Sequence, residues 1–542
     1  ESIRSTAGSG TVCAGGSQEF LLRVDGQVSE PIFLRRVLSC DIQSNKAVFV
    51  VADDDGRYEI AAEIGATSQG LRFSCRAKGP EPIWMIEWRL SGLDLTEVVI
   101  PALGGQAVTS AMPRGERLSY KYPFWWNAQF AIGMTGDDSG VWWRTQETDP
   151  RFKLLRVGRE SSAFDVTIGF EANGPLSVGP LSGEFFLDAF AGSWKEPVDR
   201  HREWLQREFK LTPYRSHAAY PSWVNNINLV LELWGMRRDR GRPAHTFDDM
   251  CERIERFATQ HPPSETLLYL PGFARGGIDS GIPDYSPSTK LGGATGFARL
   301  MDTAHQLGYR VMIHTNVLGM AFNHPLFDRF ERHQVVDVFG RPQGWGLDLD
   351  GDWLAEPYFA YIKPGEQEWS ALISNMLTEF VAEYRVDAVF IDQTLLAFNV
   401  SRGPNFVAGM RKHIERLQQS FPATLFAGEG INEHVLPALP VVQIHGIDSI
   451  AGVHGMDDQV PWRYVHPVST YLFSTHTRFL AHLLTKHPSN PVFQRQEAAY
   501  AKLGVVPAIV CYDREDELSG PEIDAVLERA RQPSTSHVPS VT

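Results

Sequence analysis

Hydrophobic and polar positions alternate in short segments over about the first 210 residues of the chain. Segments such as KAVFVVADD, GLRFSCRA and IWMIEWRLSGL are separated by Gly, Asp, Ser and Pro at short intervals. A period of two residues indicates half-buried strands, and frequent turn residues indicate tight connections between them. We therefore expect an antiparallel β-sandwich here. A sparser apolar pattern over 193–209 predicts a connecting helix that lies on the surface.

The pattern of hydrophobic and polar residues changes after residue 225, where short apolar runs alternate with longer amphipathic segments. The clearest of these segments is 365–384, in which apolar residues recur every three or four positions and predict a helix with one apolar face. Weaker versions of the pattern occupy 295–307 and 403–420. Strands that alternate with helices in this way are what a (β/α)8 barrel requires. The expected strands are 226–233, 266–271, 309–315, 387–392, 424–429, 441–446, 470–475 and 505–511.

These patterns predict an α/β protein in which a (β/α)8 TIM barrel follows an antiparallel β-sandwich domain. We place the sandwich and its connector helix at 1–215, the barrel at 216–515, and a C-terminal helix with a polar tail at 516–542. A doubly wound open sheet is the structural alternative. The absence of a glycine-rich phosphate-binding turn after the first strand of the series weakens that alternative.

The net charge limits the classes of binding partner that we expect. The formal net charge of −14 repels phosphate backbones, so we do not expect nucleic acid to bind. No apolar run approaches the roughly 20 residues of a membrane span, so we expect no membrane partner. A homo-oligomer is possible. The compartment stays open between a bacterial periplasmic or secreted location and the cytoplasm.

The five cysteines are scattered and show no C-x-x-C spacing that would indicate zinc. We expect buried free thiols, with one disulfide possible among Cys13, Cys40 and Cys75. No H-x-H or H-E-x-x-H spacing indicates a metal site either. We therefore expect neither a metal nor a cofactor. Calcium binding remains an alternative for one loop, because three acids alternate around Gly351. The terminal Glu of a typical calcium loop is missing there. These acids are Asp348, Asp350 and Asp352.

Two carboxylates end neighbouring strands of the predicted barrel. Asp392 ends the fourth strand in VDAVFIDQ, and Glu429 ends the fifth in FAGEGINE. The carboxyl ends of barrel strands hold the active site, so both acids should lie on one rim. Two carboxylates that flank one bond are the machinery of glycoside hydrolysis. Alternatively, Asp392 caps the next helix and Glu429 accepts backbone hydrogen bonds. Glu433 competes with Glu429 for the role of acid, unless it caps a helix or forms a salt bridge.

Further polar and aromatic residues fall near the predicted strand ends. Sugar sites need donors and acceptors for hydroxyl groups, and flat apolar faces for the ring C–H groups. For each tryptophan the alternative is core packing, and for each histidine a structural role. The candidate substrate-binding residues are Asp284, Tyr285, His314, Asn316, Gln393, His445, Arg463, Trp234 and Trp345.

The order of these motifs resembles a known group of enzymes. VDAVFIDQ and FAGEGINE, which follow a β-sandwich and a YLPGF…PDYSP region, resemble barrel glycoside hydrolases that cleave α-linked sugars. The resemblance is above all to the endo-α-N-acetylgalactosaminidase-like group and to related bacterial barrel proteins. It implies that Asp392 is the nucleophile and Glu429 the general acid/base, and it favours retention. The N-acetyl recognition residues do not match, so the sugar is not implied. Related clans place an Asp acid two strands later, where only Asp448 is available.

The predicted function is therefore hydrolysis of an α-linked glycosidic bond in an oligosaccharide, polysaccharide or glycoconjugate. The expected partner is the carbohydrate substrate. Three alternatives remain open: a metal-dependent hydrolase, a polysaccharide lyase and a carbohydrate-binding protein without catalytic activity.

Overall fold

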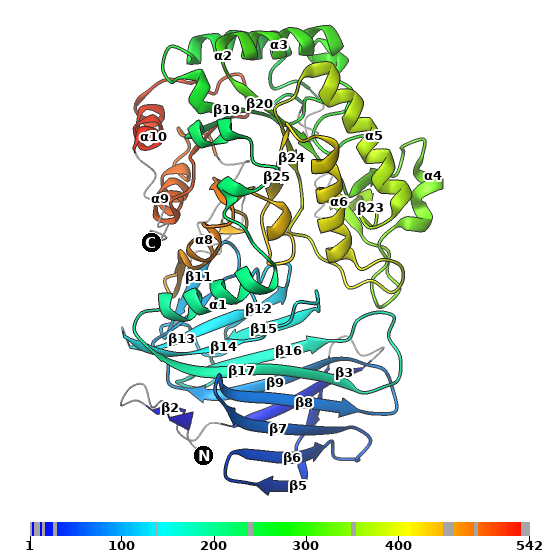
Figure 1. Ribbon diagram of the computed structural model, residues 1–542, viewed down its shortest axis with the longest axis vertical. Coiled ribbons are helices and arrows are strands. Elements are labelled where there is room, and N and C mark those ends of the chain that lie inside the picture. Colours follow the sequence, from blue (N-terminus) through cyan, green and yellow to red (C-terminus); the bar gives the residue numbers. More distant parts are fainter. Residues whose placement is uncertain are drawn as a thin grey trace.

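The computed structural model describes two packed parts joined by one helix (Figure 1). Antiparallel sheets form the N-terminal part, and a barrel of strands and helices lies above them. Helix α1 (Lys195–Glu208) lies between the two. The described residues are 3–4, 11–13, 17–24, 30–136, 138–236, 242–347, 354–447, 460–481 and 486–532.

The N-terminal sheets pack face to face around a shared apolar core, which confirms the predicted β-sandwich. Trp88 of one sheet contacts Phe185 of the other, with ring centroids 5.6 Å apart. The first sheet contains β1 (Ile3–Arg4), β2 (Thr11–Cys13), β3 (Gln18–Val24), β4 (Ile32–Leu34), β9 (Ile83–Leu93), β12 (Arg117–Tyr122), β15 (Lys153–Gly158) and β16 (Phe164–Glu171). The second contains β5 (Arg36–Ile42), β6 (Lys46–Ala52), β7 (Glu59–Thr67), β8 (Gly70–Lys78), β10 (Glu97–Ile100), β11 (Gln106–Thr109), β13 (Phe130–Gly136), β14 (Ser139–Arg144), β17 (Leu181–Ala191) and β27 (Arg463–Val465).

Strand β27 comes from the barrel half of the sequence, yet it pairs with β11 at the edge of the sandwich. The two halves therefore share a sheet, and our division at residues 215 and 515 stays a proposal.

The helix α1 is more deeply buried than its sparse apolar pattern predicted. His201 and Val198 are fully buried between the two parts, so the expectation of a surface connector was wrong.

The second half forms the predicted barrel of parallel strands. Leu480 bridges Val506 in parallel register and closes the ring between the seventh strand and the eighth. The seventh strand was predicted at 470–475, but that segment lies largely in helix α8 (Val468–Phe473) and the strand follows at 478–480. The barrel strands are β18 (Leu229–Leu233), β19 (Thr266–Leu270), β20 (Arg310–Thr315), β24 (Ala388–Ile391), β25 (Leu425–Glu429), β26 (Val441–Gln443), β28 (Arg478–Leu480) and β29 (Ala508–Cys511).

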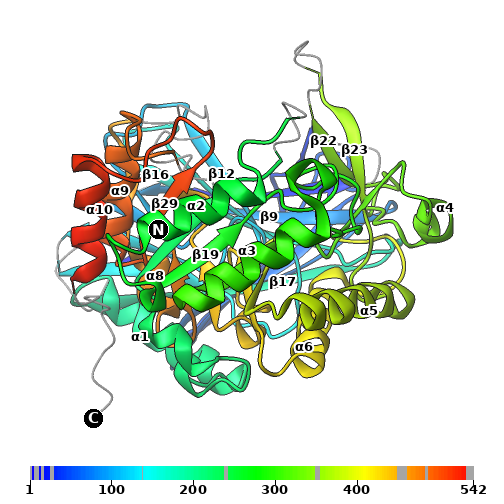
Figure 2. The same cartoon turned by 90° about the horizontal axis from the view of Figure 1, so that it is seen from above.

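The helices surround the barrel, and Figure 2 shows α2 (Phe247–Phe257), α3 (Gly293–Leu307) and α5 (Gln367–Tyr384) on the side away from the sandwich. The predicted helix at 365–384 is confirmed: Trp369, Ile373 and Leu377 form its buried stripe. A small sheet of β21 (Gly319–Ala321), β22 (Gly344–Leu347) and β23 (Glu356–Tyr361) projects between β20 and β24. The remaining helices are α4 (Phe327–Phe330), α6 (Phe406–Ser420), α9 (Phe493–Leu503) and α10 (Pro521–Arg531).

Cys40, Cys75, Cys251 and Cys511 are free thiols, so a disulfide between Cys40 and Cys75 is excluded. In the described segments, every helix falls short of the length and apolar character that a bilayer span requires.

Candidate active site

Asp392 and Glu429 lie at the carboxyl ends of two adjacent parallel strands. In the register of β24 and β25, Ile391 pairs with Gly428, so the acid that follows each residue points to the same rim. Both acids are buried, with 8% and 7% of their surface exposed. The Gln393 backbone N–H donates to Glu429 Oε2 at 2.8 Å. Gln393 has a left-handed backbone, with φ at 60°, and its hydrogen bond links one acid to the residue after the other.

Asn316 holds Asp392 in place from the neighbouring strand. Its Nδ2 donates to Asp392 Oδ2 at 3.1 Å and to Gln393 Oε1 at 3.0 Å. Its Oδ1 accepts from the N–H groups of Leu318 and Gly319, each at 2.9 Å. Every side-chain atom of this fully buried amide that can form a hydrogen bond therefore has a partner, which fixes the orientation of the carboxylate.

Tyr285 supports the same residue. Its hydroxyl donates to Asn316 O at 2.8 Å and accepts from Asn316 N at 2.7 Å. Tyr285, Asn316 and Gln393 were predicted as substrate-binding residues. The structure places all three around Asp392 as buried supports, with Tyr285 acting through Asn316.

The pKa of Asp392 lies well above its usual range. Burial is the main cause, and the negative charges of Glu429 and Asp279 add to it, while His314 and Asn316 oppose it. Two like charges in one buried site resist simultaneous ionisation. The pair therefore retains one proton at pH values where an exposed carboxylate would have lost it.

His314 lies next to this pair and joins two residues that the sequence analysis missed. Its Nδ1 is 2.6 Å from the Tyr269 hydroxyl, and its Nε2 is 3.1 Å from Asp279 Oδ1. Burial raises the pKa of Tyr269 well above its usual range, helped by the charges of Glu232 and Asp392, so its hydroxyl stays protonated. His314 thus connects Tyr269 with Asp279 in one polar cluster.

Among the described residues, one group has the geometry to hold a metal ion. Atoms of Asp279, His314 and Asp392 lie within 4.8 Å of one another. Both ring nitrogens of His314 also have hydrogen-bond partners, the Tyr269 hydroxyl and Asp279. The metal-dependent alternative nevertheless has its candidate ligands here.

Asp279 takes the place in the structure that we had predicted for Asp284. Asp284 instead accepts from the backbone of Ser286 and lies 3.8 Å from Arg275. Both acids occupy the loop after β19, and only the backbone turns decide which of them faces His314. Asp279 has a φ of 52°, a left-handed conformation that the sequence did not signal.

Tyr361 is a further residue that was not predicted, and it comes from β23 in the projecting sheet. It is buried, and burial raises its pKa above the usual range, with the charge of Asp392 as the next cause. A hydrogen bond with Gln393 acts in the opposite direction. The excursion between β20 and β24 therefore supplies one wall of the site.

Three predicted substrate-binding residues have other surroundings. Trp234 is buried, stacks on Tyr512 at 4.8 Å and donates from Nε1 to Glu232 at 2.6 Å. Trp345 is 37% exposed on β22. Arg463 lies in β27 within the sandwich sheet. Trp234 is connected to the His314 cluster through Glu232, whose charge helps to raise the pKa of Tyr269.

His445 follows β26 and lies beside the acid, as predicted. Its Nδ1 is 3.8 Å from Glu429 Oε1. Trp125 of the sandwich stacks on the His445 ring, with centroids 5.3 Å apart and planes 22° apart. The sandwich therefore reaches the rim of the barrel on the side of Glu429.

Glu433 occupies a different environment from Glu429. It is fully buried and accepts hydrogen bonds from Tyr122, Gln129 and His201, which belong to the sandwich and α1. Burial alone would raise its pKa, but His201 and Tyr122 outweigh this effect and lower it. An acid whose charged form is stabilised by fixed donors is poorly suited to give up a proton. Glu433 thus joins the sandwich to the barrel, and no α-helix begins at 430–436.

The possible calcium ligands Asp348, Asp350 and Asp352, and the alternative acid Asp448, lie outside the described residues.

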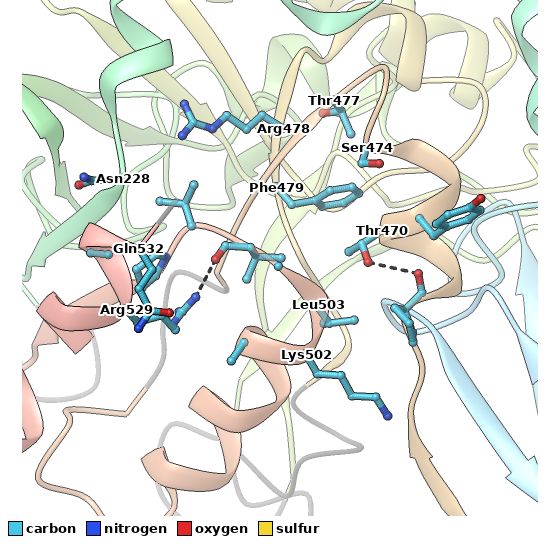
Figure 3. Close-up of a pocket in the computed structure, with 18 of the residues that line it drawn as sticks. Asn228, Thr470, Ser474, Thr477, Arg478, Phe479, Lys502, Leu503, Arg529 and Gln532 are labelled. Atoms are coloured by element: carbon cyan, nitrogen blue, oxygen red, sulfur yellow. Dashed lines mark hydrogen bonds between the residues drawn. The ribbon is translucent and has the colours of Figure 1, made fainter. Parts of the chain in front are cut away.

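A separate cavity of about 400 Å³ lies at the other end of the barrel (Figure 3). Asn228 precedes β18, Arg478 begins β28 and Val506 precedes β29, so the cavity is at the amino ends of the strands. Residues at that end of a barrel serve stability rather than catalysis. The candidate active site is therefore the carboxylate pair at the opposite end.

Known structures share this layout at low sequence identity. The α-N-acetylgalactosaminidase NagBb from Bifidobacterium bifidum, in complex with GalNAc, superposes with a TM-score of 0.71 and 12% identity, over 96% of this chain and 87% of that chain. The α-galactosidase TtGalA from Thermus thermophilus, in complex with stachyose, gives 0.54 and 14%, over 91% and 99%. The GH36 α-galactosidase AgaA from Geobacillus stearothermophilus gives 0.50 and 10%, over 94% and 74%. These likenesses confirm the sandwich-plus-barrel fold.

A search of curated protein sequences finds no match. One family model matches residues 180–461, slightly more than half of the chain and including both Asp392 and Glu429. The chain belongs to the family described as a domain of unknown function, DUF6259.

Proposed function

We propose that the protein is a glycoside hydrolase that cleaves an α-linked glycosidic bond with net retention. The observation that carries the proposal is the buried pair Asp392 and Glu429, which lie at the ends of adjacent strands and are linked through Gln393. Two acids in such an arrangement supply a nucleophile and a proton donor for one bond.

In the first step, Asp392 attacks the anomeric carbon while Glu429 protonates the departing oxygen. The bond from the anomeric carbon to this oxygen breaks, and a glycosyl ester with Asp392 forms. In the second step, Glu429 takes a proton from water, and the water oxygen displaces Asp392 from the anomeric carbon. Two inversions give net retention, which requires carboxyl groups about 5–5.5 Å apart.

The pKa of Asp392 bears on whether the pair carries a proton. The raised pKa of Asp392 means that the empty pair holds a proton, and the mechanism requires one protonated and one ionised acid. Positive charge develops at the anomeric carbon in the transition state and favours the ionised form of the nearer carboxylate. In the proposed arrangement the proton is then on Glu429, and Asp392 is ionised.

The polar cluster of Asp279, His314 and Tyr269 is the proposed binding site for the hydroxyl groups of the cleaved sugar. It offers a carboxylate acceptor and an imidazole at the edge of the nucleophile. The similar structures are named as an α-N-acetylgalactosaminidase and α-galactosidases, so α-galactosides and α-N-acetylgalactosaminides are the first substrates to test.

The test uses aryl α- and β-glycosides of several sugars with the wild type, Asp392→Gly and Glu429→Gln. Retention is followed by NMR of the first-formed product anomer. With an activated aryl leaving group and azide, loss of the nucleophile should give the β-glycosyl azide, and loss of the acid/base should give the α-glycosyl azide. Both variants should lose at least about a hundredfold in hydrolysis without azide.

The stereochemistry of the azide product shows which acid is the nucleophile and which is the acid/base. If the two variants gave the opposite azide anomers, the roles of Asp392 and Glu429 would be reversed. If a glycoside is cleaved and both variants keep wild-type rates, the two-carboxylate mechanism is wrong. In that case Asp279 and His314, which could ligate a metal, should be tested next.

A further inference from the structure

Exposed apolar side chains gather on one short segment of the sandwich. In the described part of the chain, ten large hydrophobic residues are exposed, and four of them are Phe33, Val37, Leu38 and Ile42. Val37 exposes 62% of its surface and Ile42 exposes 69%. Single exposed apolar residues are normal on a protein surface, whereas several on one segment indicate a binding face.

The same segment contains a sheet edge. Strand β5 ends the second sheet, and among the described strands it pairs only with β6. All seven residues of β5 are exposed. Figure 1 shows this strand at the end of the molecule away from the barrel. Edge strands often carry lysine or proline, which hinder the pairing of another strand, but the sequence RVLSCDI has neither.

The apolar residues of β5 lie on the face that points toward the sandwich core, because directly opposite residues of an antiparallel pair share a face. Cys40 is opposite Phe49, whose ring contacts Trp88 with centroids 6.3 Å apart. Val37 is opposite Val51 of the same core. Val37 and Cys40 are nevertheless exposed, so the first sheet does not cover β5. The strand therefore has both an open apolar face and an open edge.

A bulge in β5 makes this edge complementary to a second copy of itself. The register with β6 skips Leu38, so Val37 and Cys40 share the inner face. Arg36 and Asp41 share the outer face for the same reason. When two β5 strands pair antiparallel about a two-fold axis at the bulge, Arg36 is opposite Asp41 of the second copy. Val37 is then opposite Cys40 of the second copy, so residues of the same face meet throughout.

The charges of this edge also match. Opposite charges meet twice across the two-fold axis, once for each copy. Among the described residues, neither Arg36 nor Asp41 has an ion-pair partner, and Asp41 accepts a hydrogen bond from Gln43 Nε2 at 2.8 Å. Both side chains can therefore pair across the axis without breaking an ion pair within the chain.

We propose that the segment 33–42 is an interface between two copies of this chain, whose β5 strands pair antiparallel across a two-fold axis. The paired strands join the two second sheets into one continuous sheet. Val37, Cys40 and Ile42 of both copies form one apolar patch on its inner face. The barrels lie at the outer ends of this dimer (Figure 1), so both candidate active sites stay open, and the inference does not depend on the proposed function.

Sedimentation velocity of the full chain from about 1 to 200 μM tests the proposal, because a strand edge with a few apolar side chains is a small interface. The wild type should show a monomer–dimer equilibrium. Val37→Lys should raise the Kd of the dimer at least about tenfold, because it places a charge from each copy in the apolar patch. Val178→Lys is the matched control: Val178 is 63% exposed outside the segment, and its replacement should change Kd by less than about twofold.

Charge reversal tests the register. Arg36→Glu or Asp41→Lys alone places like charges opposite each other twice and should raise Kd about fivefold to fiftyfold. The double variant Arg36→Glu/Asp41→Lys exchanges the two charges and should return Kd to within about threefold of the wild type. Unfolding midpoints of all the variants check that each is folded.

A wild type that stays monomeric at every concentration would overturn the proposal and leave this edge to a strand of a different protein. A dimer that neither Val37→Lys nor the charge reversals weaken would also overturn it, because the interface would then lie elsewhere. If the single reversals weaken the dimer and the double variant does not restore it, Arg36 is not opposite Asp41, and the proposed pairing is wrong.

Discussion

The strongest prediction separates Glu433 from Glu429 by replacing each with glutamine. Glu433 Oε1 is 2.6 Å from His201 Nε2 and accepts from Gln129 N at 3.3 Å. Its Oε2 accepts from the Tyr122 hydroxyl at 2.7 Å and from Gln129 Nε2 at 2.8 Å. Glutamine has the same shape, but only one of its two terminal atoms accepts hydrogen bonds, so at least one donor of this buried cluster loses its acceptor.

The expected loss of stability in Glu433→Gln follows from these contacts. A hydrogen bond to a charged group contributes about 1.5–3 kcal/mol, and a buried donor left unpaired costs about 1–3 kcal/mol. Breaking a buried charge pair by removal of one partner costs about 3–5 kcal/mol. We expect Glu433→Gln to lower the free energy of unfolding by about 3 kcal/mol. If the cooperative unit has roughly 150–250 residues, the unfolding midpoint should fall by roughly 6–12 °C.

The pH dependence gives a second test of the same residue. The folded pKa of Glu433 is lowered from 4.5, so its stabilising contribution is present above that value and is lost as the pH falls through the folded pKa. The difference in stability between wild type and Glu433→Gln should therefore be constant from neutral pH down to about 5 and shrink below about 4.

The assay combines denaturant unfolding with hydrolysis rates measured well below the unfolding midpoints. Glu433→Gln should be less stable yet keep kcat within about threefold of wild type, because its side chain touches structural partners. Glu429→Gln should lose activity and unfold at or above the wild-type midpoint, because it removes a charge that opposes Asp392. Glu415→Gln, at a partly exposed ion pair with Arg411, is the control and should change stability by less than about 0.5 kcal/mol. A stable but inactive Glu433→Gln would refute the assignment.

Four further outcomes are expected. Asn316→Ala should lower kcat about a hundredfold, because the carboxylate of Asp392 loses the amide that orients it; unchanged kinetics would remove that role. Asp279→Asn takes away a charge that raises the pKa of Asp392, so the acidic limb of kcat/KM against pH should move to lower pH, and an unmoved limb would contradict the coupling. Gly446→Ala should destabilise the protein by about 1–3 kcal/mol in denaturant unfolding, since φ is positive and the new Cβ meets Leu103, whereas wild-type stability would show that the loop relaxes. Dialysis against a chelator should leave hydrolysis unchanged; a loss restored by one divalent ion would instead support the metal alternative at Asp279, His314 and Asp392.

The sequence predicted the barrel well where apolar strands lie between amphipathic helices. The strands that end in Asp392 and Glu429 lie between amphipathic helices and were found close to their observed bounds. The seventh strand was misplaced because TYLFST, rich in β-branched and aromatic residues, resembles a strand but lies largely in α8. The observed strand has only three residues, Arg478–Leu480, and such a short run carries almost no periodic signal.

The same reasoning explains which site residues were found. A polar residue at the end of an apolar run is visible in sequence, which is how Asp392, Glu429, Asn316 and Gln393 were predicted. Asp279 was invisible because a left-handed turn, not a pattern, brings it to His314. Tyr361 and Trp125 come from the projecting sheet and the sandwich, and their approach to the site depends on packing between distant segments.

The two halves of the catalytic pair depend on different parts of the molecule. The orientation of Asp392 is set inside the barrel, through Asn316 and Tyr285. The surroundings of Glu429 depend on the sandwich, because Glu433 in its loop binds Tyr122 and His445 beside it stacks on Trp125. A change at the interface between sandwich and barrel should therefore disturb proton transfer before it disturbs binding of the cleaved sugar. The pairing of β27 with β11 adds a further connection, since β27 follows β26 in the chain and belongs to the sandwich sheet.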